Sequence, residues 1–167
     1  LDTQRQFQIA GSTAARDFDK FLSSTENDLL ATSSALATTN DVGEVFRRTL
    51  NRQPVIFELI LVDPQGKVLA QRRRVGETQP GPIEQPWLAT VQTNKVYVGP
   101  VDYGEFGVPF MDIATAVTDQ AGNCSSTLLA RVDLTTLWDT VIRLQVGQTG
   151  YVYITDETGR LLAYHNL

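Results

Sequence analysis

The stretch LVDPQGKVLA (residues 61–70) recurs close to the C-terminus as ITDETGRLLA (residues 154–163). In each copy an apolar run leads into an Asp-x-x-Gly turn and then into an apolar return, which is typical of a β-hairpin. The identical positions keep a constant spacing: Asp63, Gly66, Leu69 and Ala70 return as Asp156, Gly159, Leu162 and Ala163. The repeat therefore predicts two structural units that open with the same hairpin, the second of which begins near Val146.

The first copy lies inside a longer hairpin, VIFELILVDPQGKVLAQRRR (residues 55–74). Proline in the second turn position and glycine in the fourth suit a type I turn, and the Asp63 side chain can accept hydrogen bonds from the turn backbone. The return strand ends in Arg72, Arg73 and Arg74. Adjacent arginines at a strand end are usually solvated, and this is what we expect here.

Two helices are predicted before this hairpin. Small and apolar residues recur in steps of three and four at Phe7, Gly11, Ala14, Phe18, Phe21, Thr25, Leu29, Thr32 and Leu36. A helix over residues 3–39 would extend for roughly 50–60 Å, which favours a stalk or a dimerisation element; a helix lying across a sheet is the alternative. Asn40 and Asp41 are candidate caps of a shorter helix that Pro54 ends.

After the hairpin, residues 75–86 are rich in proline and glycine and are predicted to form a loop. A short helix with Trp87 and Val91 follows, and then strands over residues 95–101, 109–119 and 125–134. Asp133 can cap a helix that reaches Leu144. The predicted fold is α+β, with a five-stranded antiparallel sheet flanked by helices.

Composition excludes several classes of protein. The 167 residues carry a net charge of −5, which argues against a nucleic-acid partner. A single cysteine and a single histidine fit no disulfide framework and no metal site. No apolar run reaches the roughly 20 residues of a membrane span. The chain starts without a methionine or a leader, so we expect a processed protein or an excised fragment whose membrane attachment lies in other segments.

Three further stretches follow the long N-terminal helix and LVDPQGKVLA in the chain: VYVGPVDYGEFGVPFMDIATAV (residues 96–117), LLARVDLTTLWDTV (residues 128–141) and VGQTGYVYITDETGRLLAYHN (residues 146–166). Together they resemble the double Cache family, the extracytoplasmic PAS-like sensor domains of bacterial and archaeal transmembrane receptors. The resemblance implies a stalk helix (1–40), a membrane-distal PAS-like module with the ligand pocket (41–145) and the truncated start of a second module (146–167). It implies a periplasmic or extracellular position. The apolar stripe and the length of the N-terminal helix favour a homodimer through that helix, and no cofactor is predicted. The output domain would be a sensor histidine kinase of a two-component system, with a chemoreceptor or a nucleotide cyclase as alternatives.

In amino-acid-binding members of that family, an Arg-x-Trp-Tyr stretch binds the ligand carboxylate, and a later tyrosine and aspartate bind the amine. The corresponding stretch here is Gln85-Pro86-Trp87-Leu88, so Trp87 matches while the arginine and the tyrosine are replaced. Arg72 or Arg74 could supply the missing cation, although strand alternation turns only one face of their strand toward a pocket. The candidate ligand-binding residues are Trp87, Tyr103, Asp133, Arg72, Arg74, Tyr97, Asp102 and Asp112. The ligand is expected to be a small polar organic molecule, with amino acid, carboxylate and amine all open.

Each candidate also has a structural explanation, because Trp87 can belong to the core and Asp133 can cap a helix. An enzyme is disfavoured, since His165 stands alone near the end of the chain and no nucleotide-binding glycine motif occurs. No catalytic and no metal-binding residue is therefore predicted. The remaining alternative is a dimerisation or spacer module without a ligand, which would be filled where a sensor has a polar cavity near Trp87 and Tyr103.

Overall fold

The computed structural model describes residues 2–74, 85, 87–92, 96–104, 107–143, 153–155 and 161–164. The chain divides into two compact units, one of residues Thr25–Asp133 and one that combines Leu1–Ser24 with Leu134–Leu167. Helix α1 (Asp2–Thr38) contributes to both units. The boundaries at residues 40 and 145 belong to the modules that the resemblance implies, and they stay a prediction.

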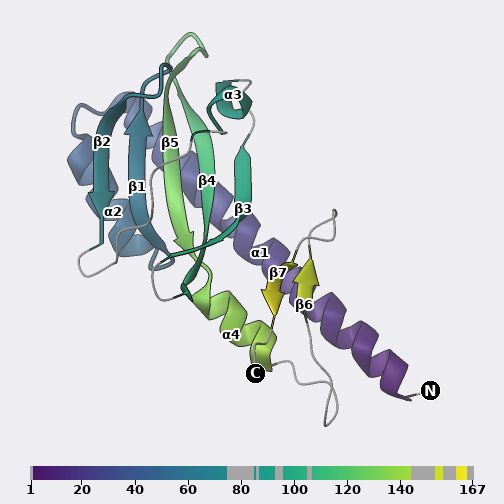
Figure 1. The fold of residues 1–167 in the computed structure, drawn as a ribbon. Coiled ribbons are helices and arrows are strands. Elements are labelled where there is room, and N and C mark those ends of the chain that lie inside the picture. Colours follow the sequence, from purple (N-terminus) through teal and green to yellow (C-terminus); the bar gives the residue numbers. More distant parts are fainter. Residues whose placement is uncertain are drawn as a thin grey trace. The chain divides into compact units, whose positions relative to one another are not determined.

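The larger unit is built on one antiparallel sheet with the strand order β2-β1-β5-β4-β3 (Figure 1). Its strands are β1 (Ile56–Val62), β2 (Val68–Arg73), β3 (Tyr97–Tyr103), β4 (Pro109–Thr118) and β5 (Cys124–Asp133). Every residue of β1 is buried, as expected for a central strand covered on both faces. The predicted α+β class and the five-stranded antiparallel sheet are confirmed.

Helix α2 (Val42–Arg52) and residues 25–38 of α1 lie on one face of this sheet (Figure 1). The Asp41 carboxylate accepts a hydrogen bond from the Glu44 backbone N–H at 3.0 Å, so the predicted helix cap is confirmed. The two helices are joined by the hydroxyl groups of Thr32 and Thr49, which lie 3.0 Å apart. The apolar stripe of α1 is therefore buried inside this unit at Thr25, Leu29, Thr32 and Leu36.

The turn between β1 and β2 has the predicted chemistry. The Asp63 carboxylate accepts hydrogen bonds from the backbone N–H groups of Gln65 and Lys67, both at 2.9 Å. Gly66 closes the turn with a φ of 86°, a conformation that side chains with a Cβ rarely adopt. The short helix α3 (Trp87–Gln92) contacts β3, β4 and β5, and Figure 1 shows it on the face of the sheet opposite α1 and α2.

The smaller unit contains α4 (Thr135–Arg143) and the strands β6 (Tyr153–Thr155) and β7 (Leu161–Tyr164). The strands pair antiparallel, which confirms the second hairpin, and β7 contacts α4. The expected start of a further module at Val146 and the lone histidine, His165, lie outside the described residues. Across the described part of the chain, no helix is long and apolar enough to cross a membrane.

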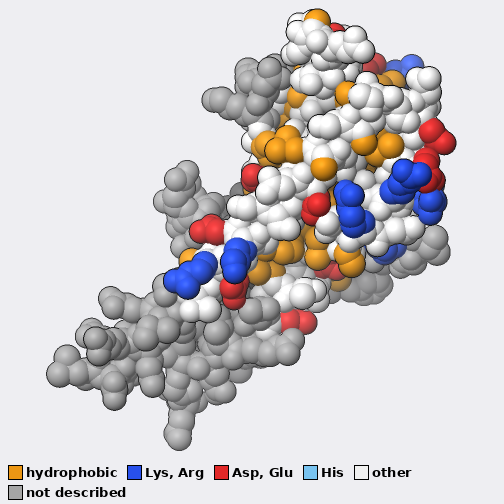
Figure 2. Space-filling view, turned by 180° about the vertical axis from the view of Figure 1, so that it is seen from behind, with side chains coloured by type: hydrophobic (Ala, Val, Ile, Leu, Met, Phe, Trp, Pro, Cys, Tyr) orange, Lys and Arg blue, Asp and Glu red, His pale blue; other side chains and the backbone are white. Residues whose placement is uncertain are grey.

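Figure 2 shows the surface from behind the view of Figure 1, with acidic and basic side chains interspersed among apolar patches. Part of this mixture is local pairing along α2, where Glu44 contacts Arg47 at 2.7 Å and Arg48 at 2.6 Å. Such exposed pairs are screened by water and salt. These ion pairs on α2 therefore contribute little to the stability of the fold.

Candidate ligand-binding site

The sheet face on which α3 packs, called the α3 face below, gathers side chains from four strands. The pairing register sets Glu58 opposite Arg131 and Arg131 opposite Asp112, so these three side chains share one face. Alternation then adds Ile60 and Val62 on β1, Leu129 on β5 and Ala114 on β4, which pack with Trp87. The α3 face thus has an apolar half and a charged half.

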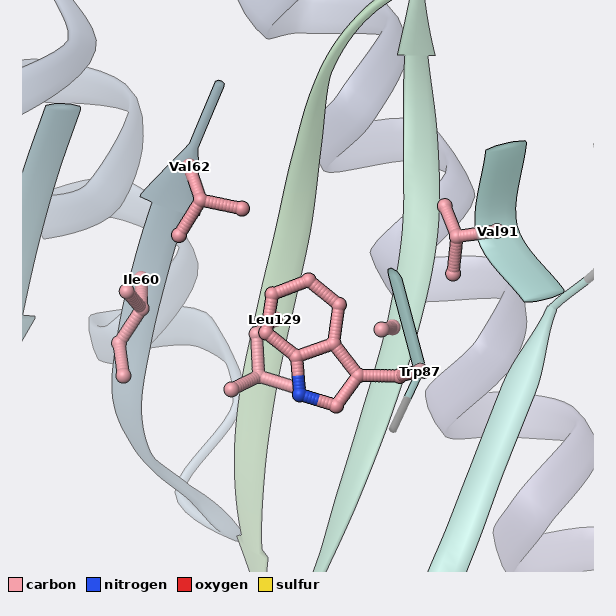
Figure 3. Packing of buried hydrophobic residues seen from close by; sticks show 6 residues of the cluster. Ile60, Val62, Trp87, Val91 and Leu129 are labelled. Carbon is pink, nitrogen blue, oxygen red and sulfur yellow. The ribbon is translucent and has the colours of Figure 1, made fainter. Parts of the chain in front are cut away.

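Trp87 is the centre of the apolar half (Figure 3). Its side chain is 1% exposed and packs against Ile60, Val62, Ala114, Leu129 and Val91. Burying an indole ring of this size contributes several kcal/mol, on the order of 3–5 by truncation to alanine. Trp87 therefore contributes to the core, and any ligand contact would be an additional role of the same ring.

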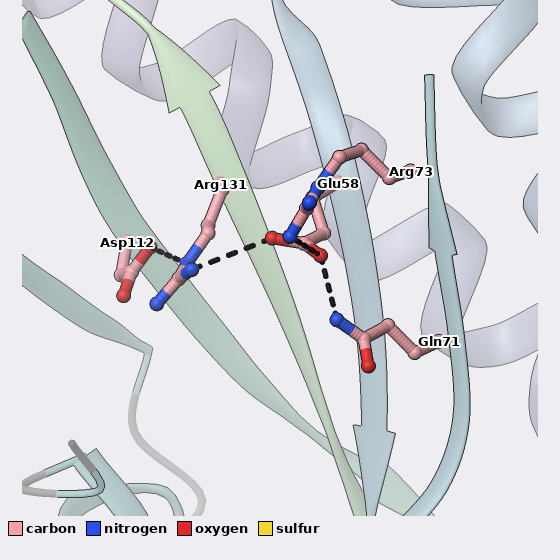
Figure 4. A network of polar contacts seen from close by, with 5 residues as sticks. All are labelled: Glu58, Gln71, Arg73, Asp112 and Arg131. Carbon is pink, nitrogen blue, oxygen red and sulfur yellow. Dashed lines mark hydrogen bonds and ion pairs between the residues drawn. The ribbon is translucent and has the colours of Figure 1, made fainter. Parts of the chain in front are cut away.

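Glu58 is the centre of the charged half, and its side chain is completely buried (Figure 4). One carboxylate oxygen accepts hydrogen bonds from Arg73 Nη2 and Gln71 Nε2, both at 2.7 Å. The other lies 3.4 Å from Arg131 Nη1. Arg131 in turn donates from Nε to Asp112 at 3.2 Å, which extends the network over β2, β1, β5 and β4.

A buried carboxylate is expensive unless it is paired, and several donors around Glu58 supply that pairing. Arg131 is itself 4% exposed and is divided between two acids. The Phe110 ring lies 5.7 Å below its guanidinium carbon, a cation–π distance. Among the residues that the structure describes, none is a hydrogen-bond partner of the buried Nε atom of Arg73.

Asp112 is the acid at the β4 end of this network, and its surroundings change the pKa of its carboxyl group. Burial raises the pKa of its carboxyl group to about 6, while the charge and hydrogen bond of Arg131 oppose that rise. The nearby carboxylates of Asp102 and Glu58 raise the pKa further. A positive charge placed beside Asp112 would lower its pKa again.

The structure brings most of the predicted ligand-binding residues to the α3 face. Asp112 belongs to the charged network, and Asp133 shares its face because it pairs with Phe110. Tyr97 packs against the apolar cluster around Trp87. Asp102 on β3 pairs with Phe110 on β4, so it also lies on the α3 face. Trp87, Tyr97, Asp102, Asp112 and Asp133 therefore lie on one surface, although their ligand-binding roles stay a prediction.

The other predicted residues lie elsewhere. Tyr103 is opposite Pro109, which places it on the reverse face, and it is 50% exposed. Arg72 pairs with Leu59, also on the reverse face. Arg74 donates from Nη2 to the backbone carbonyls of Leu50, Gln53 and Ile56, and so holds the end of α2. The arginine of β2 that does face α3 is Arg73.

Sequence reasoning missed Glu58, Gln71, Arg73 and Arg131 as members of the site. The available signal was a single charged residue inside an apolar strand, since Glu58 interrupts PVIFELILV and Arg131 interrupts LLARV. A charge at such a position must find a partner when the strand is buried. Within the described part of the chain, no group of His, Cys, Asp and Glu side chains is arranged to hold a metal ion.

Solved structures with the same fold include ligand-binding domains of bacterial chemoreceptors. That of the Pseudomonas aeruginosa PAO1 amino acid chemoreceptor PctC, in complex with GABA, gives a TM-score of 0.74 at 18% identity, over 98% of this chain and 76% of that one. That of Campylobacter jejuni Tlp3, in complex with L-norvaline, gives 0.71 at 15% identity, over 98% and 69%. That of Pseudomonas fluorescens CtaA, in complex with L-isoleucine, gives 0.67 at 16% identity, over 97% and 68%. No family model and no curated protein sequence matches the chain, so the likeness concerns the fold.

Proposed function

We propose that this chain is an extracytoplasmic ligand-sensing domain of a transmembrane signalling receptor. The ligand is a small polar organic molecule with a cationic amine, bound over the α3 face. The observation that carries this proposal is the excess of carboxylates on that face. Its described acids are Glu58, Asp102, Asp112 and Asp133, whereas its described cations are Arg73 and Arg131.

An ammonium group suits this surface for electrostatic reasons. Glu58 is already bonded by Arg73 and Gln71, and Arg131 is shared with Asp112 through a longer contact of 3.2 Å. The remaining negative charge is therefore concentrated around Asp112 and Asp102. A cation desolvated beside carboxylates and an aromatic ring gains both charge pairing and cation–π attraction.

The solved structures of the same fold support this ligand class. PctC is in complex with GABA and Tlp3 with L-norvaline, and both ligands carry an amino group. In this chain Arg73, whose pairing with Glu58 places it on the α3 face, is the arginine that we assign to an acceptor group of the ligand. Arg73 then replaces Arg72 and Arg74 as the arginine of the site.

The test is thermal denaturation of the protein with panels of amines, amino acids and carboxylic acids that lack an amine. A ligand at one hundred times its dissociation constant adds about 2.7 kcal/mol. For a chain of this size that free energy raises Tm by several degrees, at roughly 2–4 °C per kcal/mol. Amines or amino acids should raise Tm, and shifts with amine-free carboxylates alone would contradict the cationic ligand class.

Two matched variants locate the site. Asp112→Asn removes a carboxylate from the α3 face, and Asp19→Asn removes one from an exposed position of α1. Because the ligand amine would lose its counter-charge only in the first variant, Asp112→Asn should weaken binding at least tenfold, about 1.4 kcal/mol, and Asp19→Asn should not. Equal affinities in the two variants would place the ligand elsewhere.

The affinity should also depend on pH in a defined direction. A cationic ligand requires ionised Asp112, whose pKa of about 6 in the free protein means that most of this carboxyl group is protonated at pH 5. We expect binding that is about tenfold weaker at pH 5 than at pH 7, with uptake of a proton on ligand release. An affinity that is constant over this range would exclude Asp112 as the counter-charge.

A spacer module without a ligand is the second candidate, and the observation that favours it is the dense packing around Trp87. A folded protein that shows no Tm shift with any compound class would support this reading. A homodimer through α1 stays part of the proposal. Because Leu29 and Leu36 are buried within the chain, such a dimer would use other residues of the helix.

For the receptor that contains this domain, we propose a sensor histidine kinase as the output, with a chemoreceptor signalling domain or a nucleotide cyclase as alternatives. The measurement is phosphoryl transfer from ATP to a histidine of the full-length receptor in membranes, with and without ligand. Ligand-dependent transfer would identify a kinase. Its absence, together with ligand-dependent control of a separate kinase, would identify a chemoreceptor.

A further inference from the structure

One polar contact joins the segment that carries Trp87 to the turn between β1 and β2. Gln85 Nε2 donates a hydrogen bond to the backbone carbonyl of Gly66 at 2.9 Å. The Gln85 backbone carbonyl also accepts from the Leu88 N–H at 3.3 Å, at the beginning of α3. Gln85 therefore touches both the turn and the first residues of the helix.

Gly66 is shaped to receive this side chain. A Cβ atom built at Gly66 would overlap Gln85 Oε1 and would lie 3.1 Å from Gln85 Cδ. The absence of a side chain at Gly66 thus creates the space in which the amide lies. Its φ of 86° is a separate requirement, since glycine adopts it without strain.

The contact lies beside the apolar half of the α3 face. Val62 is the last residue of β1 before the turn, and it packs against Trp87, which is two residues beyond Gln85. Helix α3 has only six residues, too few to be stable by itself. Its position therefore depends on its contacts with the rest of the chain, which are made by the buried side chains of Trp87 and Val91 and by the exposed amide of Gln85.

We propose that Gln85 and Gly66 form a latch that positions α3, and with it Trp87, over the ligand-binding surface. Gln85 occupies the place where the resemblance would put a ligand-binding arginine, but its amide is used by the turn. It is a positioning residue, and its effect on ligand affinity rests on the proposed function. The existence of the latch does not depend on the proposed function, because the latch acts on Trp87 in the free protein.

The test measures the accessibility of Trp87 by acrylamide quenching of its fluorescence, in a Trp138→Phe background that leaves Trp87 as the single tryptophan. The variants are Gln85→Ala, Gly66→Ala and the double variant. Gly122→Ala is the matched control, since Gly122 has a φ of 83° and nothing within 4 Å of a Cβ. It introduces the same backbone strain without touching a latch.

Loss of one hydrogen bond should raise the fraction of molecules with α3 detached about threefold to tenfold. We expect greater quenching in Gln85→Ala and in Gly66→Ala, no further increase in the double variant, and the parent level in Gly122→Ala. Quenching that is equal in Gly66→Ala and Gly122→Ala, or unchanged in Gln85→Ala, would overturn the proposal.

Ligand affinity provides the second readout. With a compound from the panel, Gln85→Ala and Gly66→Ala should bind about threefold to tenfold more weakly than Gly122→Ala. If no compound binds, the proposed function fails, while the quenching result still decides whether the latch exists. If a compound binds all variants equally although quenching differs, the latch exists but does not position the binding surface, and the inference is overturned.

Discussion

Replacement of Arg131 by methionine tests whether the charged network holds the sheet together. Arg131 is 4% exposed and contacts Glu58 at 3.4 Å, Asp112 at 3.2 Å and the Phe110 ring. Methionine keeps much of the aliphatic length and removes the charge. The change therefore leaves two carboxylates on β1 and β4 without their shared cation.

The size of the effect follows from what each carboxylate retains. Removing one partner of a buried ion pair costs about 3–5 kcal/mol. Glu58 keeps Arg73 and Gln71, both at 2.7 Å, so the lower end of this range applies. We expect a loss of about 3 kcal/mol at pH 7.5, equivalent to roughly 6–12 °C in Tm for a chain of this length.

The loss should be smaller at pH 5. The pKa of Asp112 is raised in the folded protein from an ordinary 3.8 to about 6, so the folded state holds this proton more tightly than the unfolded state does. Asp112 therefore favours folding below its ordinary pKa, and this contribution is lost as the pH rises through about 6. Without Arg131 the pKa rises further, and protonation at pH 5 removes part of the penalty, about 1.4 kcal/mol for each additional unit.

Urea denaturation at pH 7.5 and pH 5 measures the free energy of unfolding that is lost in Arg131→Met at each pH. Arg47→Met is the control, because Arg47 is exposed and contacts Glu44 at 2.7 Å on the surface of α2, where we expect little change. A loss in Arg131→Met no larger than that of the control would refute the stabilising role of the network. A loss that is identical at the two pH values would refute the coupling between Arg131 and Asp112.

Three further variants test the placement of side chains outside the network. Arg74→Met should destabilise the protein by about 1.5–3 kcal/mol in urea denaturation, since it removes the charged donor from the carbonyls at the end of α2, whereas Arg72→Met should change little. Trp87→Ala should cost about 3–5 kcal/mol, because the ring is 1% exposed in an apolar cluster. A loss below about 1 kcal/mol in Trp87→Ala would show that the ring is not a core element.

Local chemistry explains why the sequence predicts so much of the fold. The Asp63–Gly66 turn and the Asp41 cap each involve residues within a few positions of one another, and both occur as predicted. The predicted stripe of α1 is buried in its second half, at Thr25, Leu29, Thr32 and Leu36. The repeated hairpin was readable for the same reason, since its turn residues and its apolar strands are adjacent in the chain. These features require no knowledge of how distant segments pack.

The composition of the site depended on long-range pairing that no local pattern contains. Glu58 and Arg131 meet because β1 and β5 are neighbours in the sheet, although many residues separate them in the chain. In the register of β2, Arg73 lies on the α3 face, whereas Arg72 and Arg74 lie on the reverse face. The sequence indicated a cluster of arginines, but the register selected the one that contacts Glu58.

Strand β3 shows most clearly that the alternation of residues along a strand does not fix which face they share. Tyr97 and Asp102 are an odd number of residues apart, so plain alternation would place them on opposite faces. The register shifts between Val98 and Val101, and this extra residue returns Asp102 to the face of Tyr97. The sequence alone thus determined the elements and their order, because these follow from neighbouring residues. Only the tertiary structure decided which side chains share the α3 face, because that depends on register, bulges and strand order.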